Sequence, residues 1–285
     1  MSKFLSSPHA KIHPNDVVSL AIGKFDGMHL AHLHLLENLC DKGGILCIQT
    51  NEPKALTPAD SKEQYTNIPF FYLTLESIKN LSGKEFAEFL CENFSHLRSI
   101  IIGYDFRFGK GREFGASDLC FLLPHIKITI FKEFCVNDMG VHSSLIKEFI
   151  ALGNMKMANA LLGRTYGIFG KSIRGQNLGN KELYATINMD SGQYFLPQNG
   201  VYATFSEFNG KRYTSVSFVG NRLSTDRHFS VETHILDSVI EFLPTHLSVF
   251  FVQKIRDNEH FGTLSELKAQ IGKDIKRARE ILADS

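Results

Sequence analysis

Apolar and polar positions follow different patterns in the two halves of the chain. In the first half, short apolar stretches rich in β-branched residues alternate with segments of helical spacing, which predicts parallel strands joined by crossover helices. One such segment, residues 83–94, brings Phe86, Ala87, Phe89 and Leu90 onto one helical face. The predicted strands are residues 17–22, 44–49, 70–75, 99–103 and 126–131. This half is therefore predicted to be an α/β domain built on a parallel sheet.

The second half loses the helical period after residue 164 and consists of short strands separated by turn residues. Six strands at this close spacing predict a small antiparallel β-barrel. The strands cover residues 166–173, 183–189, 201–208, 213–219, 230–236 and 247–255. Thr263 and Glu266 have the spacing of a capping box that opens a last helix, and we expect the apolar face of that helix to pack on the barrel. We place the domain boundary between residues 158 and 159, which gives the domains 1–158 and 159–285.

Length, charge and cysteine spacing narrow the class of protein further. A chain of 285 residues is long enough for two domains with separate cores. Its 31 Lys and Arg residues nearly balance 30 Asp and Glu residues, so no global basic field favours a nucleic-acid partner. No signal-peptide pattern and no stretch long enough to cross a bilayer is present, so we expect a cytoplasmic protein without a membrane partner. The five cysteines lack C-x-x-C spacing, which predicts buried free thiols.

The first candidate chemistry lies where an apolar strand breaks at Gly23 and two histidines follow, three residues apart. Gly23 and Gly27 permit a tight turn, and residues 30–39 have helical spacing, so His29 and His32 are expected in the first turn of a helix. Backbone N–H groups and the helix dipole favour an anion there, and imidazole donors add hydrogen bonds to it. The pattern alone also allows a surface pair of histidines without function.

Seven segments in a fixed order carry motif-like patterns. They are residues 23–32, 103–111, 141–147, 160–164, 185–188, 196–202 and 231–237. Together they resemble, nearly end to end, the motifs of the bacterial bifunctional riboflavin kinase/FMN adenylyltransferase family. The first segment is similar to the family's G-x-F-D-G-x-H-x-G-H motif, and A-T-I-N at 185–188 stands in the place of its P-T-A-N motif. The resemblance implies a Rossmann-like nucleotidyltransferase domain followed by a six-stranded antiparallel barrel kinase domain with a C-terminal helix.

The resemblance implies two ATP-dependent reactions, phosphorylation of riboflavin to FMN in the second domain and adenylylation of FMN to FAD in the first. It makes His29 and His32 catalytic, since they would bind the phosphates of ATP and stabilise charge at the α-phosphorus. The other nucleotide- or phosphate-binding positions implied in this half are Gly23, Phe25, Asp26, Gly27, Asp105, Ser143, Ser144 and Lys147. From the residues alone, Asp105 could equally cap a turn.

In the second domain the resemblance makes Glu232 the general base and assigns Thr186 and Asn188 to Mg²⁺ and phosphate. A hydroxyl and an amide oxygen are suitable ligands for Mg²⁺, and Glu232 would lie on the strand face opposite its apolar neighbours. By pattern alone, Glu232 could be a solvated strand carboxylate and Arg256 could form a surface salt bridge. The remaining implied positions are Gly170 and Gly175 for the nucleotide and Arg256 and Glu259 for the flavin.

Four departures from the family's pattern suggest that the kinase activity and the FAD-synthesis activity are not equally well retained. Ala31 replaces the second glycine of the histidine motif, Lys147 replaces an arginine, and residues 49–54 lack the family's F-x-P-H-P-like segment. The fourth departure, in residues 179–185, removes a glycine and the proline that precedes the threonine of the kinase motif. Because three of the departures fall in the adenylyltransferase half, we expect kinase activity to be intact but somewhat altered and FAD synthesis to be slower or specialised.

Two alternatives stay open from the sequence. One keeps only the riboflavin kinase, with the first domain as a degenerate nucleotide-binding module. The other is a non-catalytic flavin or nucleotide sensor, against which a predicted base beside a predicted metal site argues. The expected small-molecule partners are riboflavin, FMN and ATP with Mg²⁺, and we expect a monomer or a weak homo-oligomer.

Overall fold

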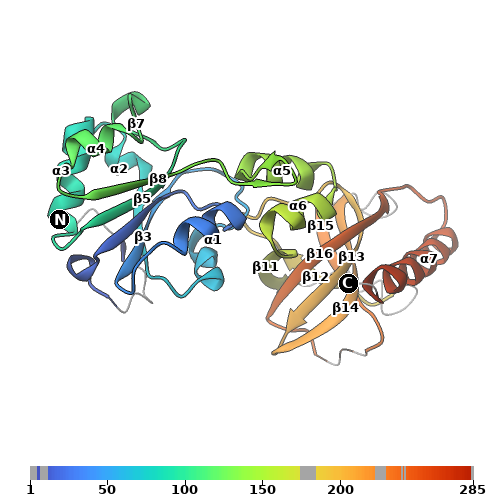
Figure 1. The fold of residues 1–285 in the computed structure, drawn as a ribbon. Helices are drawn as coiled ribbons and strands as arrows, with labels where there is room; N and C mark the ends of the chain where they lie inside the picture. The colour runs from blue at the N-terminus through green and yellow to red at the C-terminus, as the bar shows by residue number, and fades with distance from the viewer. Residues whose placement is uncertain are drawn as a thin grey trace. The chain divides into compact units, whose positions relative to one another are not determined.

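A computed structural model describes residues 5–6, 12–173, 184–221, 229–238, 240 and 242–283 (Figure 1). The chain divides into two compact units, residues 1–143 and 144–285. This division falls before the boundary that we expect between residues 158 and 159, and the assignment of one activity to each domain stays a prediction. Gly175, one of the expected nucleotide-binding positions, lies outside the described residues.

The first unit is built on a six-stranded sheet with the order β1-β4-β3-β2-β5-β8. Its strands are β1 (Leu5–Ser6), β2 (Ser19–Gly23), β3 (Gly43–Gln49), β4 (Phe70–Thr74), β5 (Ser99–Gly103) and β8 (Lys127–Phe131). β1 pairs antiparallel with β4, and all other neighbours are parallel. The parallel sheet expected from the apolar stretches is confirmed, and β2, which leads into the histidine segment, lies between β3 and β5.

Helices cover both faces of this sheet, with α3 and α4 on one face and α1 on the other. The helices are α1 (Leu30–Leu36), α2 (Leu75–Ile78), α3 (Gly83–Asn93) and α4 (Asp118–Leu122). Short 3₁₀ turns and two small hairpins complete the unit, namely η1 (Pro14–Asp16), η2 (Ala59–Tyr65), η3 (Lys110–Arg112), β6 (Arg107–Phe108) with β7 (Phe114–Gly115), and β9 (Cys135–Val136) with β10 (Met139–Gly140). This two-sided cover explains why the strands are almost continuously apolar.

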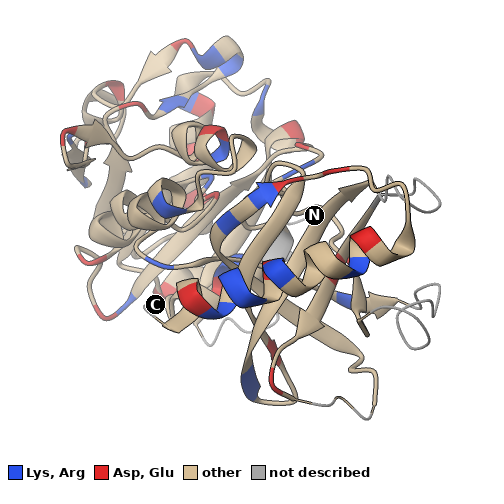
Figure 2. Ribbon diagram, turned by 90° about the vertical axis from the view of Figure 1, so that its right-hand side faces the viewer, with Lys and Arg blue, Asp and Glu red and all other residues tan. Residues whose placement is uncertain are grey.

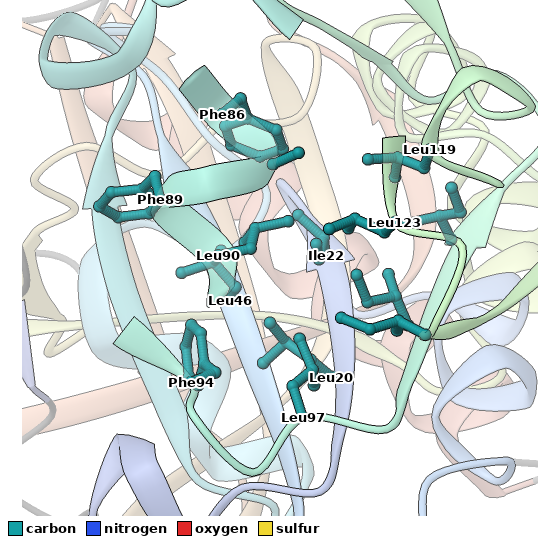
Figure 3. Packing of buried hydrophobic residues seen from close by; sticks show 14 of the residues in the cluster. Leu20, Ile22, Leu46, Phe86, Phe89, Leu90, Phe94, Leu97, Leu119 and Leu123 are labelled. Carbon is teal, nitrogen blue, oxygen red and sulfur yellow. The ribbon is translucent and has the colours of Figure 1, made fainter. Parts of the chain in front are cut away.

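The α3 face of the sheet carries a dense core. In the cluster shown in Figure 3, Leu90 of α3 lies close to Ile22 of β2 and Leu46 of β3. Fully burying one such side chain stabilises the fold by about 1.5–3 kcal/mol. The helix begins at a capping box, in which the Ser82 hydroxyl accepts from the Glu85 N–H and the Glu85 carboxylate accepts from the Ser82 N–H, at 3.2 and 2.7 Å. The core therefore fixes β2, whose carboxyl end carries the candidate site.

The second unit contains a closed barrel with the strand order β11-β12-β15-β14-β13-β16. The strands are β11 (Tyr166–Ile173), β12 (Ile187–Asp190), β13 (Gly200–Phe208), β14 (Lys211–Asn221), β15 (Phe229–Ile235) and β16 (His246–Asp257). Every neighbouring pair is antiparallel. Helices α5 (Ser143–Ala151) and α6 (Met155–Leu162) precede the barrel in the chain. The six-stranded antiparallel barrel expected from the strand spacing is confirmed.

The last helix, α7 (Leu264–Ala283), packs on the outer face of the barrel through Ile275 and Ala278. The capping box at its start is present, because the Thr263 hydroxyl accepts from the Glu266 N–H and the Glu266 carboxylate accepts from the Thr263 N–H, both at 3.2 Å. Figure 2 shows both basic and acidic residues along α7, which is typical of a helix with one face in solvent. Both predictions for this helix are confirmed.

No helix in the described part of the chain is long and apolar enough to cross a membrane. The cysteines are free, but the expectation that all of them are buried is wrong. Cys47 is buried in strand β3, whereas Cys40, Cys120 and Cys135 are exposed and Cys91 is half-buried. Cys40 follows α1, Cys120 lies on α4, and Cys135 lies in the hairpin of β9 and β10.

Candidate active sites

The turn after β2 has backbone angles that most residues avoid. φ is 51° at Phe25, 88° at Gly27 and 41° at Met28. The positive φ at Gly27 confirms its predicted role in the turn, whereas Gly23 serves a close approach, since a Cβ there would lie 3.3 Å from the Phe25 ring. Phe25 and Met28 are buried, at 1% and 0% exposure. A non-glycine residue in this region costs about 1–3 kcal/mol and persists only where its surroundings enforce it.

The two histidines that follow the turn stack on each other. Their ring centroids are 3.6 Å apart and the rings are inclined by 15°. His32 lies in the first turn of α1, as expected, whereas His29 is the residue that caps it, with Nδ1 accepting from the His32 N–H at 3.4 Å. Because Nδ1 of His29 is an acceptor, the neutral ring carries its proton on Nε2. His29 therefore offers a hydrogen-bond donor of the kind that binds phosphate oxygens.

Side chains from distant parts of the chain hold this turn. The Gly27 N–H donates to Thr57 Oγ1 at 2.8 Å, and the Thr57 N–H donates to Asp26 Oδ1 at 3.0 Å. The Ser143 hydroxyl donates to the Asp26 carbonyl oxygen at 2.7 Å. Lys62, which is 7% exposed, donates from Nζ to the Thr57 carbonyl oxygen at 2.6 Å. The structure thus brings the predicted residues Asp26, Gly27 and Ser143 together.

The turn at residues 25–28, which leads into His29 and His32, is called the histidine turn below. Asp105 lies at the same edge of the sheet as this turn. β2 and β5 are parallel neighbours, and the carboxyl ends of such strands form a common edge where ligands bind. Asp105 follows β5 and is exposed. Its Oδ1 lies 2.8 Å from the position that a Cβ on Gly103 would take, so the glycine leaves room for the carboxylate to fold back over the strand end. The nucleotide-binding role of Asp105 stays a prediction.

Ser144 and Lys147 belong to the second unit, where they lie on α5. Lys147 Nζ is 5.9 Å from the centroid of the Phe195 ring in the same unit, which is within the range of a cation–π contact. The expected roles of both residues at the histidine turn stay predictions.

The three residues expected to carry kinase chemistry meet on one outer face of the barrel. Asn188 of β12 and Glu232 of β15 are direct partners in the strand register. The Thr186 hydroxyl donates to Glu232 Oε2 at 3.3 Å, and the Ser230 hydroxyl donates to Glu232 Oε1 at 2.8 Å. Asn188 is 5% exposed, Glu232 is half-buried and Thr186 is exposed. The arrangement places a hydroxyl, an amide and an oriented carboxylate within one site.

Gly170 has a structural reason to be glycine. It lies where β11 approaches β12, and a Cβ on it would overlap the carbonyl oxygen of Asp190 and lie 2.8 Å from Met189 Cγ. The close approach of these two strands positions the first residues of β12, which include Asn188. Whether Gly170 also contacts a nucleotide stays a prediction.

Arg256, an expected flavin-binding residue, is half-buried and forms an ion pair with a buried carboxylate. Its Nε donates to both carboxylate oxygens of Asp274 at 3.0 Å, and its Nη2 donates to Asp274 Oδ2 at 2.8 Å. Asp274 lies on α7 and is only 3% exposed, so this is not the surface salt bridge that the sequence allowed. Glu259 is exposed and lies 4.0 Å from Arg256 Nη1. The pair joins β16 to α7, and the flavin-binding roles of Arg256 and Glu259 stay predictions.

The two units together define a class of protein. A parallel sheet with a phosphate-suited histidine turn, linked to a barrel with an oriented carboxylate beside hydroxyl and amide oxygens, is a two-part nucleotide-dependent transferase. The family model described as Flavokinase: Riboflavin kinase matches residues 162–282 of this chain. A bifunctional riboflavin kinase/FMN adenylyltransferase from Buchnera aphidicola subsp. Schizaphis graminum is 30% identical over 93% of this chain and 94% of the relative. The chain therefore belongs to the bifunctional riboflavin kinase/FMN adenylyltransferase family.

Further comparisons agree with this membership and with the fold. A protein of the same description from Escherichia coli K12 is 28% identical over 94% of this chain and 93% of the relative. A crystal structure described as a macrolide-efflux protein from Streptococcus pneumoniae has a TM-score of 0.81 and 22% identity, over 95% of this chain and 96% of that one. At that identity the likeness shows the fold alone.

Three residues of these sites were not predicted from the sequence. Ser230 lies two positions before Glu232, so the strand period already places it on the same face and could have identified it. Thr57 and Lys62 lie about 30 residues beyond the turn that they hold, in a segment without a clear period. No local pattern links them to the turn, and only the fold brings them there.

Proposed function

We propose that the barrel unit phosphorylates riboflavin to FMN and that the α/β unit transfers the adenylyl group of ATP to FMN, giving FAD and pyrophosphate. The observation that carries this proposal is the convergence of Thr186, Asn188 and Glu232 on one barrel face. The near full-length match to curated bifunctional relatives supports the second activity, because it includes the half of the chain that holds the histidine turn.

In FAD synthesis, a phosphate oxygen of FMN attacks the α-phosphorus of ATP as the bond to the β-phosphate oxygen breaks. Negative charge grows on the phosphate oxygens, and donors fixed in advance stabilise it. His29 supplies such a donor at Nε2, and the stacked His32 ring limits its rotation. The N–H of Gly27 donates to Thr57 Oγ1, and this bond helps to fix the turn.

In FMN synthesis, the terminal hydroxyl of the ribityl chain attacks the γ-phosphorus of ATP and loses its proton, while the bond to the β-phosphate oxygen breaks and ADP leaves. Glu232 is placed to accept that proton as a general base. The hydroxyls of Thr186 and Ser230 donate to its two carboxylate oxygens and hold the side chain at its strand position. A base oriented in this way does not have to search for the reacting hydroxyl.

The oxygen donors on the barrel face fit a hard divalent cation such as Mg²⁺. Thr186 offers a hydroxyl oxygen and Asn188 an amide oxygen, next to the carboxylate of Glu232. These two residues would hold a cation that accompanies ATP and takes its other ligands from phosphate and water. When bound, Mg²⁺ neutralises charge on the transferring phosphoryl group.

Chromatography of the flavins tests the proposal directly. The protein is incubated with ATP and Mg²⁺ and either riboflavin or FMN, and riboflavin, FMN and FAD are separated over time. We expect FMN as the first product in the riboflavin reaction and FAD in the FMN reaction. FMN without FAD in either reaction would leave only a riboflavin kinase. Binding of flavin with no turnover would favour the sensor.

A further inference from the structure

Thr57 forms hydrogen bonds with two consecutive residues of the histidine turn. Its hydroxyl accepts from the Gly27 N–H, and its own N–H donates to the side chain of Asp26. Thr57 is 1% exposed, so water does not compete for these bonds. A threonine with two bonds to one turn fixes both the position and the orientation of that turn, which a single bond cannot do.

Lys62 holds Thr57 in its position. Its Nζ donates to the Thr57 carbonyl oxygen at 2.6 Å from the 3₁₀ segment η2, and the side chain is 7% exposed. A lysine is seldom buried to this extent unless its charge is compensated. Asp26 supplies negative charge nearby. Burial raises the pKa of the Cys47 thiol to about 11, and both charges lie close enough to change that pKa, since Asp26 raises it and Lys62 lowers it.

The turn needs such a support because its backbone is strained. Phe25 and Met28 both take positive φ, and the residue that follows Met28 is His29. Without Thr57 the strained angles could relax, and the two histidine rings would move with the backbone. A displacement of about 1 Å at a reacting centre can lower a rate by about 10²-fold.

We infer that Thr57 and Lys62 are positioning residues for FAD synthesis, acting through the turn at residues 25–28 that carries His29 and His32. This inference rests on the proposed function, because it presumes that FAD is made at the histidine turn. Neither residue touches substrate in this account. Their contribution is to hold the imidazole donors where charge develops on ATP.

The test compares Thr57→Val, which keeps the shape but removes the hydroxyl, with Thr57→Ser, which keeps it. Thr66→Val is the matched control, since the Thr66 hydroxyl also accepts one backbone N–H, that of Ile68, but does not contact the turn. We expect Thr57→Val to lower kcat and kcat/KM for FAD synthesis together by about 10- to 100-fold, the size of a positioning defect. Thr57→Ser and Thr66→Val should stay near wild type. The rate of FMN formation by the barrel should be unchanged in all three.

A second substitution, Lys62→Met, removes the ammonium group and leaves the Thr57 hydroxyl in place. It should lower the same two constants in the same direction, with KM for ATP near its wild-type value. The thermal transition of each variant is measured by circular dichroism, and each assay is run below that temperature. A wild-type kcat in Thr57→Val, or an equal loss in Thr57→Val and Thr66→Val that follows loss of the helical signal, would overturn the inference.

His29→Ala separates this inference from the proposed function. If His29→Ala abolishes FAD synthesis and Thr57→Val does not reduce it, the positioning role is wrong and the proposed site stands. If His29→Ala leaves FAD synthesis unchanged, the proposed site itself is wrong and the inference is rejected with it.

Discussion

The two candidate sites are held in place by different means. The histidine turn is buried and strained, and hydrogen bonds from Thr57 and Ser143, far away in the sequence, hold it. The kinase face is more open, and the register of adjacent barrel strands brings its residues together, with Asn188 directly opposite Glu232. One site depends on a few tertiary contacts, whereas the other depends on the repeating geometry of a closed barrel.

This difference predicts how each site responds to substitution. A barrel register is fixed by many backbone bonds, so a single side chain on its face can change with little movement of its neighbours. A strained turn held by a few bonds can shift as a whole when one of them is lost. Chemistry at the barrel should therefore be lost residue by residue, while chemistry at the turn should also be sensitive to residues that touch no substrate.

The largest expected effect comes from Glu232→Gln, which removes the base but keeps the shape. FMN formation from riboflavin should fall by about 10²- to 10⁴-fold, the usual contribution of general base catalysis. FAD formation from added FMN should stay at its wild-type rate, because it occurs in the other unit. Ser230→Ala leaves the carboxylate and removes only one of its donors, so it should lower the rate of FMN formation less than Glu232→Gln does. An unchanged rate of FMN formation in Glu232→Gln would refute the role of base.

Arg256→Ala should destabilise the barrel unit strongly. It leaves the carboxylate of Asp274, which is 3% exposed, without its bidentate partner, and breaking a buried ion pair costs about 3–5 kcal/mol. Thermal unfolding by circular dichroism measures the change, and loss of riboflavin phosphorylation on heating identifies the barrel transition. Arg256→Lys keeps the charge but loses the bidentate guanidinium, so its unfolding temperature should lie between those of the wild type and Arg256→Ala. If Arg256→Ala unfolds at the wild-type temperature, the ion pair is not a structural element of the barrel.

His29→Ala should lower the kcat of FAD synthesis by about 10²- to 10³-fold, which is typical of the loss of one preorganised donor to a developing anion. FMN formation should be unaffected. The comparison with His34→Ala is informative, since His34 lies on the same helix but pairs with the exposed Glu37. Equal losses in the two variants would point to damage of α1 rather than to chemistry at His29.

The smallest expected effect is a gain. Lys147→Arg introduces the guanidinium that the resemblance implies at this position, and its fork can donate two bonds to phosphate. We expect FAD synthesis to rise by about 2- to 10-fold, the worth of one added hydrogen bond. The rates of FMN and FAD formation, measured side by side, report whether the gain is confined to FAD. No gain, or an equal gain in both rates, would show that Lys147 does not limit FAD synthesis.

The sequence predicts the barrel site better than the histidine turn, and the reason is physical. Strand residues alternate with a period of two, so the face of Glu232 follows from its neighbours, and the antiparallel pairing then brings Asn188 beside it. The parallel sheet and the last helix follow from apolar spacing in the same way. Such features depend on local periodicity, which a single sequence contains.

The support of the turn could not be predicted, because it depends on contacts between distant segments. Gly27 indicates a turn, but nothing local indicates positive φ at Phe25 and Met28. Thr57 bonds to the turn, and Lys62 of η2 bonds to Thr57, only because the fold brings these distant segments together. The bidentate pair of Arg256 with Asp274 is a similar case, since the sequence showed the arginine but not that α7 would bury its partner.

The central claim is that two independent sites on one chain carry out successive reactions, and complementation tests it most directly. His29→Ala and Glu232→Gln proteins are incubated singly and together with riboflavin, ATP and Mg²⁺, and FAD is measured by chromatography. We expect that neither protein alone makes appreciable FAD and that the mixture does, because FMN released by one is adenylylated by the other. A mixture that makes no FAD, although His29→Ala makes FMN and Glu232→Gln is supplied with it, would contradict the account.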